Sequence, residues 1–170
     1  YVALINPDGT AHTLKWIGVN RNGLTLNHPL GSDIANGRLY VVDIDTVRWF
    51  DMKTGAPGGS VQVQGVMRFN DIEVAVDGTI YATQTGTGGQ TPDPTTWQVW
   101  KITPSGAASI FVQGAPLRQP NGIAFDEKGN IVVVNIGTAD VLTFGQDGKL
   151  LKTETAVQPG NDGLVIMKDG

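Results

Sequence analysis

Three residues with oxygen-bearing side chains recur at one position of a repeated sequence pattern. Asn70, Asn121 and Asp162 each stand eight residues before a glycine that belongs to a predicted turn. Two amide oxygens and one carboxylate are hard donors, which suit Ca²⁺ better than a transition metal. An imidazole-rich zinc site is not expected, because the two histidines, His12 and His28, fall outside this register.

The same residue types also have an ordinary structural explanation. Asn, Asp and Gly commonly form turns where a strand begins, and segments such as "PNG" and "NDG" fit a loop equally well. Any one of these residues alone would indicate a turn. Three of them in one register on consecutive repeats favour a shared site, and both interpretations stay open at this point.

The glycines that define the register belong to an internal repeat. The segments "ANGRLYVVD", "VDGTIYATQ" and "EKGNIVVVN" align with one another, and the final "KDG" begins a fourth copy. The aligned glycines are 41, 51 and 41 residues apart, and they are Gly37, Gly78, Gly129 and Gly170. The longer interval contains "GTGGQTPDPTT" at residues 86–96, which indicates an insertion of about ten residues.

Each repeat is divided by a second turn sequence. These turns contain Gly9, Gly55, Gly106 and Gly148, so each unit is expected to run strand, turn, strand, loop, strand, turn, strand. Four short strands in about 40 residues are typical of a β-propeller blade. The predicted fold is therefore all-β, a β-propeller of which this chain covers about four blades. A β-sandwich with regularly spaced turns is the alternative.

The predicted organisation is a single partial propeller domain over residues 1–170. The expected blades are 1–26 for the outer strands of one blade, then 27–66, 67–115 and 116–157, with 158–170 beginning the next. The sequence starts without a methionine in strand-like sequence and stops directly after a turn signal. We therefore expect a fragment that lacks the first and last parts of its propeller.

The architecture predicts where the recurring polar residues lie. The first strand of a blade runs along the central channel, so equivalent positions on successive blades lie at equal depth. Asn70, Asn121 and Asp162 should then form an arc at the channel mouth where the inner strands begin. The insertion at 86–96, followed by Trp97, is expected to overhang the same mouth, and a surface insertion without function is the alternative.

Composition excludes several kinds of function. The formal net charge is −4 and there is no basic cluster, so nucleic acid is not an expected partner. Cysteine is absent, so this sequence offers no disulfide, thiolate ligand or cysteine nucleophile. It has no Gly-x-Ser-x-Gly motif of a serine hydrolase and no apolar run long enough to span a membrane. The compartment and the oligomeric state stay open.

Three stretches of the sequence resemble a known family. "RFND" at residues 68–71, "PNGIAFDEKGNIVVV" at 120–134 and "NDGLVIMKDG" at 161–170 are similar to successive motifs of the senescence marker protein/gluconolactonase family. These regucalcin-like proteins are six-bladed propellers related to the paraoxonases. Members are typically lactonases or esterases that depend on a divalent metal, so the resemblance implies a small lactone or ester as substrate.

The resemblance implies a role for each motif residue. Asn121 would be a metal ligand, and Asp162 would be a metal ligand and the candidate general base. Asn70 would contact the substrate or the metal, and Arg68 would orient substrate oxygens. Asp71 matches the motif too and would have a supporting role. The implied cofactor is a divalent metal, most readily Ca²⁺.

The sequence departs from the family pattern in two respects. The family uses a further glutamate ligand from its first blade, and nothing in this sequence matches it. Pro29 occupies the equivalent register in the blade before "RFND". The histidine dyad of paraoxonases is not evident either, because Leu30 stands where one member is expected. His28 is close by but out of register, so we expect it to be a loop residue.

The leading hypothesis is metal-dependent hydrolysis of a lactone or simple ester at the channel mouth. Because a fold does not determine a function, two alternatives remain. One is a non-catalytic propeller of the NHL-repeat type that binds a ligand or a protein. The other is a different chemistry on the same scaffold, as in the strictosidine synthase-like branch, which no residue selects.

Overall fold

The structure, a computed structural model, describes residues 1–21 and 24–167. Three four-stranded antiparallel sheets dominate it, and each sheet uses four consecutive strands in chain order. The first sheet contains β5 (Pro29–Ala35), β6 (Arg38–Asp43), β7 (Thr46–Asp51) and β8 (Pro57–Gln62). The second contains β9 (Ile72–Val74), β10 (Ile80–Gln84), β11 (Gln98–Ile102) and β12 (Ala108–Gln113). The third contains β13 (Pro120–Phe125), β14 (Ile131–Asn135), β15 (Asp140–Phe144) and β16 (Leu150–Thr155).

Two smaller hairpins precede the first sheet. They pair β1 (Val2–Ile5) with β2 (Ala11–Ile17) and β3 (Val19–Arg21) with β4 (Leu24–Thr25). The described helical structure is one short 3₁₀ turn, η1 (Pro94–Thr96), in the insertion. Across the described residues, no helix is long and apolar enough to cross a membrane.

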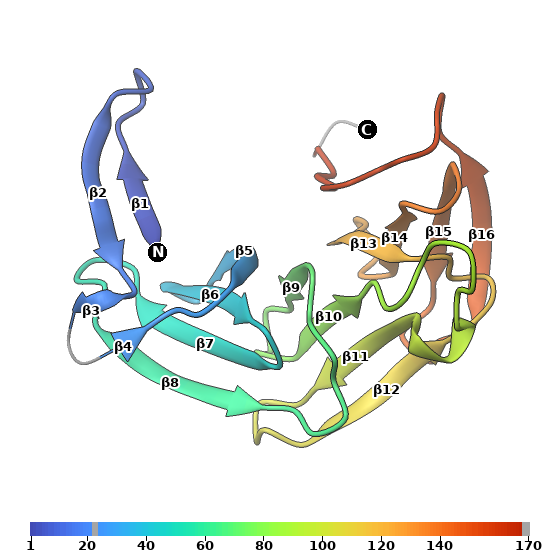
Figure 1. Ribbon diagram of the computed structural model, residues 1–170, viewed down its shortest axis with the longest axis horizontal. Coiled ribbons are helices and arrows are strands. Elements are labelled where there is room, and N and C mark those ends of the chain that lie inside the picture. Colours follow the sequence, from blue (N-terminus) through green and yellow to red (C-terminus); the bar gives the residue numbers. More distant parts are fainter. Residues whose placement is uncertain (22–23, 168–170) are drawn as a thin grey trace.

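The sheets are arranged as blades around an arc (Figure 1). The inner strands β5, β9 and β13 lie on the concave side, and the outer strands β8, β12 and β16 lie on the convex side. This arrangement confirms the predicted all-β propeller of which the chain forms a part. Residues 156–167 form no strand, and the fourth repeat glycine, Gly170, lies outside the described residues.

Glycines set the turns between the first two strands of each blade. Asn36 and Gly37 both have positive φ angles, 51° and 73°, as a type I′ hairpin turn requires. Gly78 has φ 86°, and the preceding Asp77 accepts a hydrogen bond from the Thr79 N–H at 2.8 Å. Such turns fix the strand register, and with it the face toward which each side chain points.

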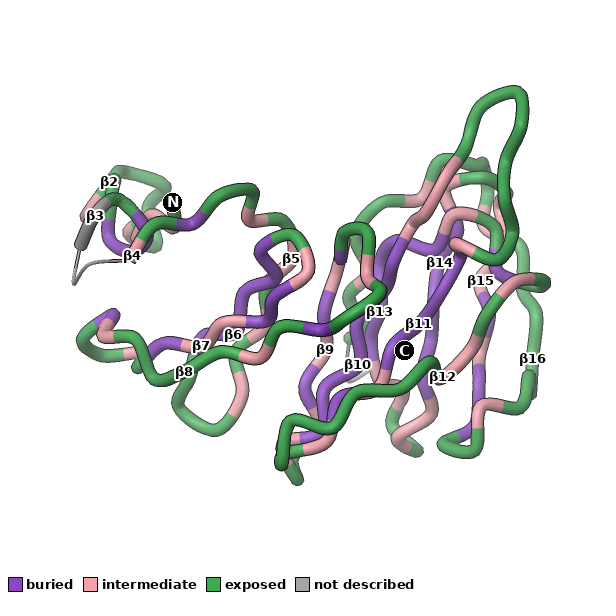
Figure 2. The backbone as a smooth tube through the Cα atoms, turned by 60° about the horizontal axis from the view of Figure 1, so that its bottom comes forward, coloured by how far each residue is buried: buried purple, intermediate pink, exposed green. Residues whose placement is uncertain are grey.

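The hydrophobic cores lie between successive sheets. We call the boundary between the first and second sheets the first seam, and that between the second and third sheets the second seam. Alternate residues of β6 serve two cores, since Leu39 packs toward the hairpins and Tyr40 packs into the first seam. In β10, Ile80 packs into the first seam and Tyr81 into the second. Figure 2 shows that buried residues concentrate on these middle strands.

Carboxylates on the inner strands also cross the seams. Asp33 of β5 accepts a hydrogen bond from the Val74 N–H at 2.9 Å across the first seam. Asp71 accepts one from the Ile123 N–H at 3.2 Å across the second. A charged acceptor strengthens such bonds, so these side chains fix the positions of neighbouring inner strands.

Candidate functional site

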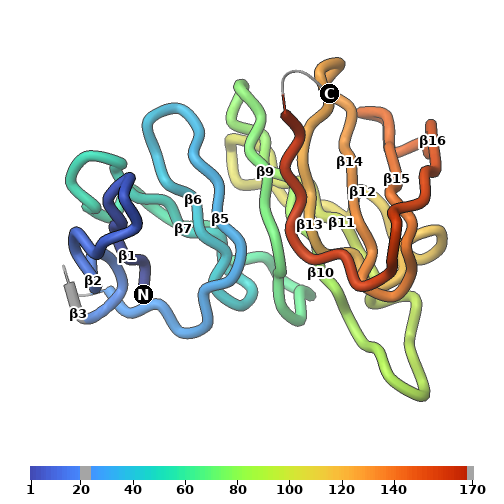
Figure 3. Tube along the Cα trace, turned by 90° about the horizontal axis from the view of Figure 1, so that it is seen from above, coloured from blue at the N-terminus to red at the C-terminus, as the bar shows by residue number. Residues whose placement is uncertain are grey.

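The three register residues meet at the channel mouth. Asn70, Asn121 and Asp162 line one hollow of about 440 Å³, which we call the mouth hollow. They come from three consecutive repeats, just before β9, in β13 and in the segment after β16. Figure 3 shows this end of the molecule, where β5 and β13 begin. The expected grouping of these residues is therefore present in the structure, and their roles stay predictions.

A hydrogen-bond chain determines which atom Asn70 offers to the hollow. The Thr85 hydroxyl donates its proton to the Pro120 carbonyl at 2.8 Å. It must therefore accept from Asn70, whose Nδ2 lies 2.9 Å away. This bond occupies the amide nitrogen and leaves the amide oxygen without a donor among the described residues. The amide oxygen of Asn70 is thus the atom that stays available for another partner.

Asn121 is the most buried residue of the three. It is 4% exposed, and its side-chain amide has no hydrogen-bond partner among the described residues. Its main chain is held by the Thr83 hydroxyl, which donates to the Asn121 carbonyl at 2.6 Å. The amide is not among the fully buried polar atoms that lack a partner, and Asn121 lines the mouth hollow. The side chain is therefore accessible from the hollow.

Asp162 is held in place through its backbone. Its carbonyl accepts a hydrogen bond from the Gly122 N–H at 2.8 Å, which aligns the segment after β16 with β13. A Cβ atom at Gly122 would lie 2.5 Å from that carbonyl oxygen. Only glycine allows this close approach. The Asp162 side chain itself is exposed at the mouth.

Arg68 lies in an adjoining hollow of about 600 Å³, which we call the side hollow. Asn70 lines both hollows and is therefore the residue that joins them. Thr85, Gly86 and Gln119 complete much of the side hollow. The Arg68 side chain is exposed and has no ion-pair partner among the described residues.

The insertion reaches this site with its base only. Gly86 lines the side hollow, and a Cβ atom at Gly88 would lie 2.2 Å from the Gln119 Nε2. Residues 88–95 are exposed, and Figure 3 shows the loop projecting from the mouth end of the molecule. The base of the insertion therefore forms a wall of the site, whereas its tip projects outward instead of covering the mouth hollow.

Two further carboxylates accompany Asp71 in the channel, and the sequence reading missed both. Asp33 and Glu73 line a hollow of about 310 Å³ that also contains Asp71. Burial raises the pKa of Asp71, and the Asp33 and Asp162 carboxylates add to the rise. Burial, followed by the Asp33 and Asp71 charges, raises the pKa of Glu73 to about 7, although a hydrogen bond from the Phe125 backbone opposes it. The sequence did contain a signal for Glu73, because Asp71 and Glu73 flank Ile72 and alternate residues of a strand point to the same face.

A second missed feature is a buried polar residue at the end of each second strand. Asp43, Gln84 and Asn135 are 2%, 1% and 0% exposed, and each stands six residues after its turn glycine. Each side-chain oxygen accepts a backbone N–H from the segment that leads into an inner strand. The donors are His28 at 2.7 Å, Met67 at 2.6 Å and Arg118 at 2.9 Å. This repeated contact positions the segments that carry Arg68 and Gln119.

The donor atoms at the mouth fit a hard divalent cation. The Asn70 amide oxygen, the Asn121 amide and the Asp162 carboxylate are the oxygen-bearing groups that Ca²⁺ prefers. Among the described residues, no group of three or more Asp, Glu or His side chains could hold a metal by itself. An ion in the mouth hollow would therefore depend on the amide oxygens.

Pro29, Leu30 and His28 are the residues at or near positions where the sequence departs from the family pattern, and two of them lie at the mouth hollow. Pro29 and Leu30 line the mouth hollow, so their register is as expected, but their side chains carry no metal-ligating atom. His28 is exposed in the loop before β5, and its N–H donates to Asp43. It is not among the residues that line the mouth hollow.

Comparisons with solved structures show the fold that this chain shares. A gluconolactonase from Xanthomonas campestris is 21% identical with a TM-score of 0.60, and the alignment covers 79% of this chain and 51% of that protein. The virginiamycin B lyase of Staphylococcus aureus is 15% identical with a TM-score of 0.61, and the alignment covers 79% of this chain and 44% of that protein. The hydrazine synthase of Kuenenia stuttgartiensis is 16% identical with a TM-score of 0.65, and the alignment covers 85% of this chain and 40% of that protein.

The chain thus spans about half or less of these proteins, whose different activities show that the likeness concerns the fold alone. A comparison with curated proteins gives no significant match. The sequence profile described as the SMP-30/Gluconolactonase/LRE-like region, however, matches residues 6–144, which is more than half of the chain. The expected membership is therefore confirmed, and the chain belongs to the SMP-30/gluconolactonase/LRE-like family.

Proposed function

We propose that the protein of which this chain is a part hydrolyses a lactone or simple ester at the channel mouth, with a divalent metal bound by Asn70, Asn121 and Asp162. Membership of the gluconolactonase family supports a hydrolase of this type. The observation that carries the proposal is that the side chains of Asn70, Asn121 and Asp162, from three consecutive repeats, line one hollow. Their oxygen atoms are the ligand type that Ca²⁺ prefers.

In this proposal the mouth hollow binds the cation and the reacting carbonyl, and the side hollow binds the rest of the substrate. When bound, a cation such as Ca²⁺ would polarise the substrate carbonyl and stabilise the negative charge that develops on its oxygen. Asn70 lies at the junction of the hollows, so a substrate that reaches the mouth hollow extends past it toward Arg68. The Arg68 guanidinium would then donate hydrogen bonds to oxygens on the body of the substrate.

Asp162 is the proposed base. Its exposed carboxylate at the mouth can accept a proton from the attacking water. Asp71 has a different role in this scheme, because its carboxylate accepts the Ile123 N–H and its burial raises its pKa. It holds β13, and therefore Asn121, in position against the neighbouring inner strand.

The test measures hydrolysis of D-gluconolactone by the intact protein, with and without EDTA, beside the variant Asp162→Asn. We expect each change to lower the rate by about 100-fold or more, and Ca²⁺ to restore the chelated protein. Asp147→Asn, at an exposed carboxylate paired with Lys149, is the matched control and should keep the full rate. Equal rates in the wild type, the chelated protein and Asp162→Asn would refute the proposal.

Direct binding of Ca²⁺ by calorimetry separates the metal from the chemistry. Asn121→Ala should weaken Ca²⁺ binding, because it removes the buried amide from the mouth hollow. Ca²⁺ binding without hydrolysis of any lactone or ester would favour a propeller that binds a ligand without catalysis.

A further inference from the structure

The second seam is filled by aromatic side chains at the end opposite the mouth. Tyr81 packs between Phe111 of β12 and Phe125 of β13, with ring centroids 5.1 Å and 5.6 Å away and nearly perpendicular planes. Lys101 stands opposite Tyr81 on β11, and its Nζ lies 5.6 Å from the centre of the Tyr81 ring. These contacts close the space between the two sheets.

The first seam lacks counterparts of these two phenylalanine rings. Val74 stands four residues before its turn glycine, where the next repeat has Phe125. Val61 corresponds to Val112, since each faces a turn glycine of the following sheet, whereas Phe111 lies at a bulge of β12. A hollow of about 620 Å³ lies in this part of the first seam, and we call it the seam hollow. Its size falls within the range of roughly 300–1,000 Å³ that is usual for small-molecule sites.

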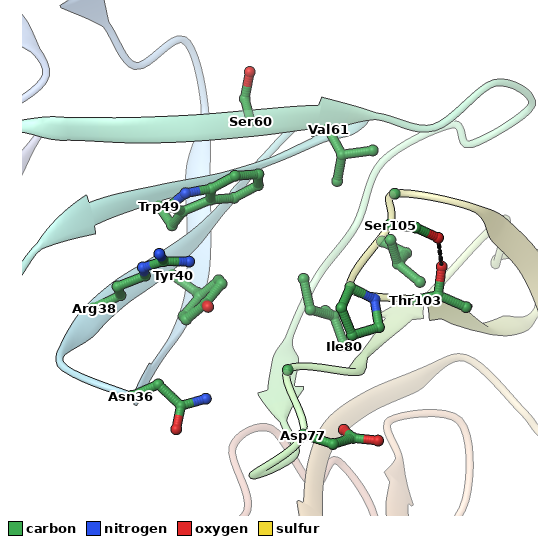
Figure 4. A pocket seen from close by; sticks show the side chains of 14 residues that line it. Asn36, Arg38, Tyr40, Trp49, Ser60, Val61, Asp77, Ile80, Thr103 and Ser105 are labelled. Atoms are coloured by element: carbon green, nitrogen blue, oxygen red, sulfur yellow. Dashed lines mark hydrogen bonds between the residues drawn. The ribbon is translucent and has the colours of Figure 1, made fainter.

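Both sheets contribute side chains to the seam hollow (Figure 4). Arg38, Tyr40 and Trp49 come from the first sheet, and Thr103 and Ser105 come from the second. The hollow lies beside the turns where the inner strands end, so it is separate from the mouth hollow. Both of its walls belong to complete four-stranded sheets.

Tyr40 and Trp49 offer aromatic surface together with unused polar atoms. Tyr40 is 5% exposed, and its hydroxyl has no hydrogen-bond partner among the described residues. Trp49 stands opposite Tyr40 on β7, with ring centroids 6.2 Å apart. The indole lies against the backbone of Gly58 and Gly59, and its Nε1–H has no acceptor among the described residues. Trp49 is half-buried, and neither polar atom is among the fully buried ones that lack a partner, so both can bond with a molecule that enters the hollow.

The rim of the seam hollow is polar and balanced in charge. Arg38 and Asp77 are the charged residues among the described ones that line it, and one carries each sign. The Asn36 Nδ2 donates to the Val76 carbonyl at 3.3 Å, which ties the two sheets together beside the hollow. The Thr103 and Ser105 hydroxyls lie at the rim and bond to each other at 2.8 Å (Figure 4). A ligand therefore meets donors and acceptors around an aromatic wall.

We propose that the seam hollow binds a neutral saccharide. A sugar ring presents an apolar C–H face, which can contact Trp49 and Tyr40, and a rim of hydroxyls, which can pair with both donors and acceptors. A purely apolar ligand would leave the Tyr40 hydroxyl and the Trp49 N–H unpaired, at a cost. A strongly charged ligand would meet the like charge of either Arg38 or Asp77.

The experiment titrates the intact protein separately with maltotriose, cellotriose and tri-N-acetylchitotriose, and follows binding by calorimetry. We expect at least one of them to bind, and Val61→Phe to weaken that binding at least tenfold, about 1.4 kcal/mol, because Val61 lines the hollow and a phenyl ring there would occupy it. Tyr40→Phe removes only the hydroxyl and should weaken binding severalfold.

Three controls separate this site from the mouth. Tyr81→Phe, the matched change in the second seam, should leave saccharide binding unchanged, and so should Asp162→Asn. Val61→Phe should keep the wild-type rate of lactone hydrolysis and the wild-type circular dichroism spectrum. Absence of binding for all three sugars, or binding that Val61→Phe does not weaken, would overturn the proposal whatever the outcome at the mouth.

Discussion

The two seams are built from the same repeat but differ at both ends of the channel. Away from the mouth, the second seam is closed by Tyr81, Phe111 and Phe125, whereas the first contains Val61 and Val74 and a hollow. The backbone arrangement is alike in both, since four-stranded sheets pack in the same order. The same backbone repeat thus forms a packed boundary where aromatic rings fill it and leaves a cavity where they are missing.

Near the mouth the seams differ in how they are hydrogen-bonded. In the first seam, the Phe69 N–H donates to the Ile44 carbonyl at 2.8 Å, which is a bond between backbones. Pro120 occupies the place of Phe69 in the second seam and has no N–H, and the Thr85 hydroxyl bonds to its carbonyl instead. The side chain that replaces the lost backbone bond also orients Asn70, so the second seam carries more of the site.

The comparison is tested most strongly by removing the central tyrosine of each seam. Tyr81→Ala should destabilise the protein by about 3–5 kcal/mol, since it removes a 4%-exposed ring and its two perpendicular aromatic contacts. Tyr40→Ala should cost about 1 kcal/mol less, because the first seam already contains a hollow. Urea unfolding measures both, and equal losses would show that the filling of the seams does not matter.

The next largest effect on the unfolding free energy is expected at Gly59, which lies against the Trp49 ring in the first seam. A Cβ atom at Gly59 would lie 2.4 Å from the Trp49 ring, so Gly59→Ser should displace the indole and cost about 1–3 kcal/mol. The matched position on β12 is Ser109, which stands opposite Lys101. Ser109→Gly should cost only about 0.5–1 kcal/mol, from the added freedom of glycine. Unfolding free energies and tryptophan fluorescence would report the change, and an unmoved Trp49 would contradict it.

Glu73, beside the second seam, should make stability depend on pH. Its pKa is raised to about 7 from an ordinary value of 4.5, so the folded protein holds this proton more tightly than the unfolded chain does. Stability is therefore lost as pH rises through this window. Between pH 5 and 8, the wild type should lose about 1–2 kcal/mol more than Glu73→Gln, after allowance for partial exposure. Parallel pH profiles of unfolding free energy would exclude this role.

The smallest expected effect on stability comes from Thr85. Thr85→Val removes the bond to the Pro120 carbonyl and the acceptor for Asn70, at a cost of about 1 kcal/mol. It should also weaken Ca²⁺ binding, because the Asn70 amide is then free to turn. Thr143→Val, at a position of β15 whose hydroxyl has no described hydrogen bond, serves as the control. Unchanged Ca²⁺ affinity in Thr85→Val would argue against the orienting role.

Much of the fold could be predicted from the sequence because the repeat is local. Turn glycines such as Gly37 and Gly78 need a positive φ, and the mainly apolar strands that follow them are buried on both faces. The register of Asn70, Asn121 and Asp162 places all three in the mouth hollow. These features depend on spacing along the chain, which a sequence displays directly.

The parts that were not predicted depend on contacts between blades. The carboxylate of Asp33 accepts a hydrogen bond from the Val74 N–H, which holds the same position one repeat later, but the repeat does not show that this side chain reaches the next blade. The seam hollow is formed by side chains of two sheets, such as Tyr40 and Ile80, and the repeat does not show how closely they pack. The strict alternation of a strand also breaks near the mouth, where the pairing of β13 with β14 is irregular between Pro120 and Ile123. Side-chain directions there follow from tertiary structure.

The sharing of β6 and β10 between two cores gives this chain a form of nearest-neighbour cooperativity. No sheet has a core of its own, so the stability of each sheet is set by the boundary on either side of it. Local opening should then begin at the boundary with the hollow, and the backbone amides of the first sheet should exchange with solvent before those of the third. A ligand that fills the first seam would act as a mechanical brace between two blades, slowing that exchange without contact with the mouth.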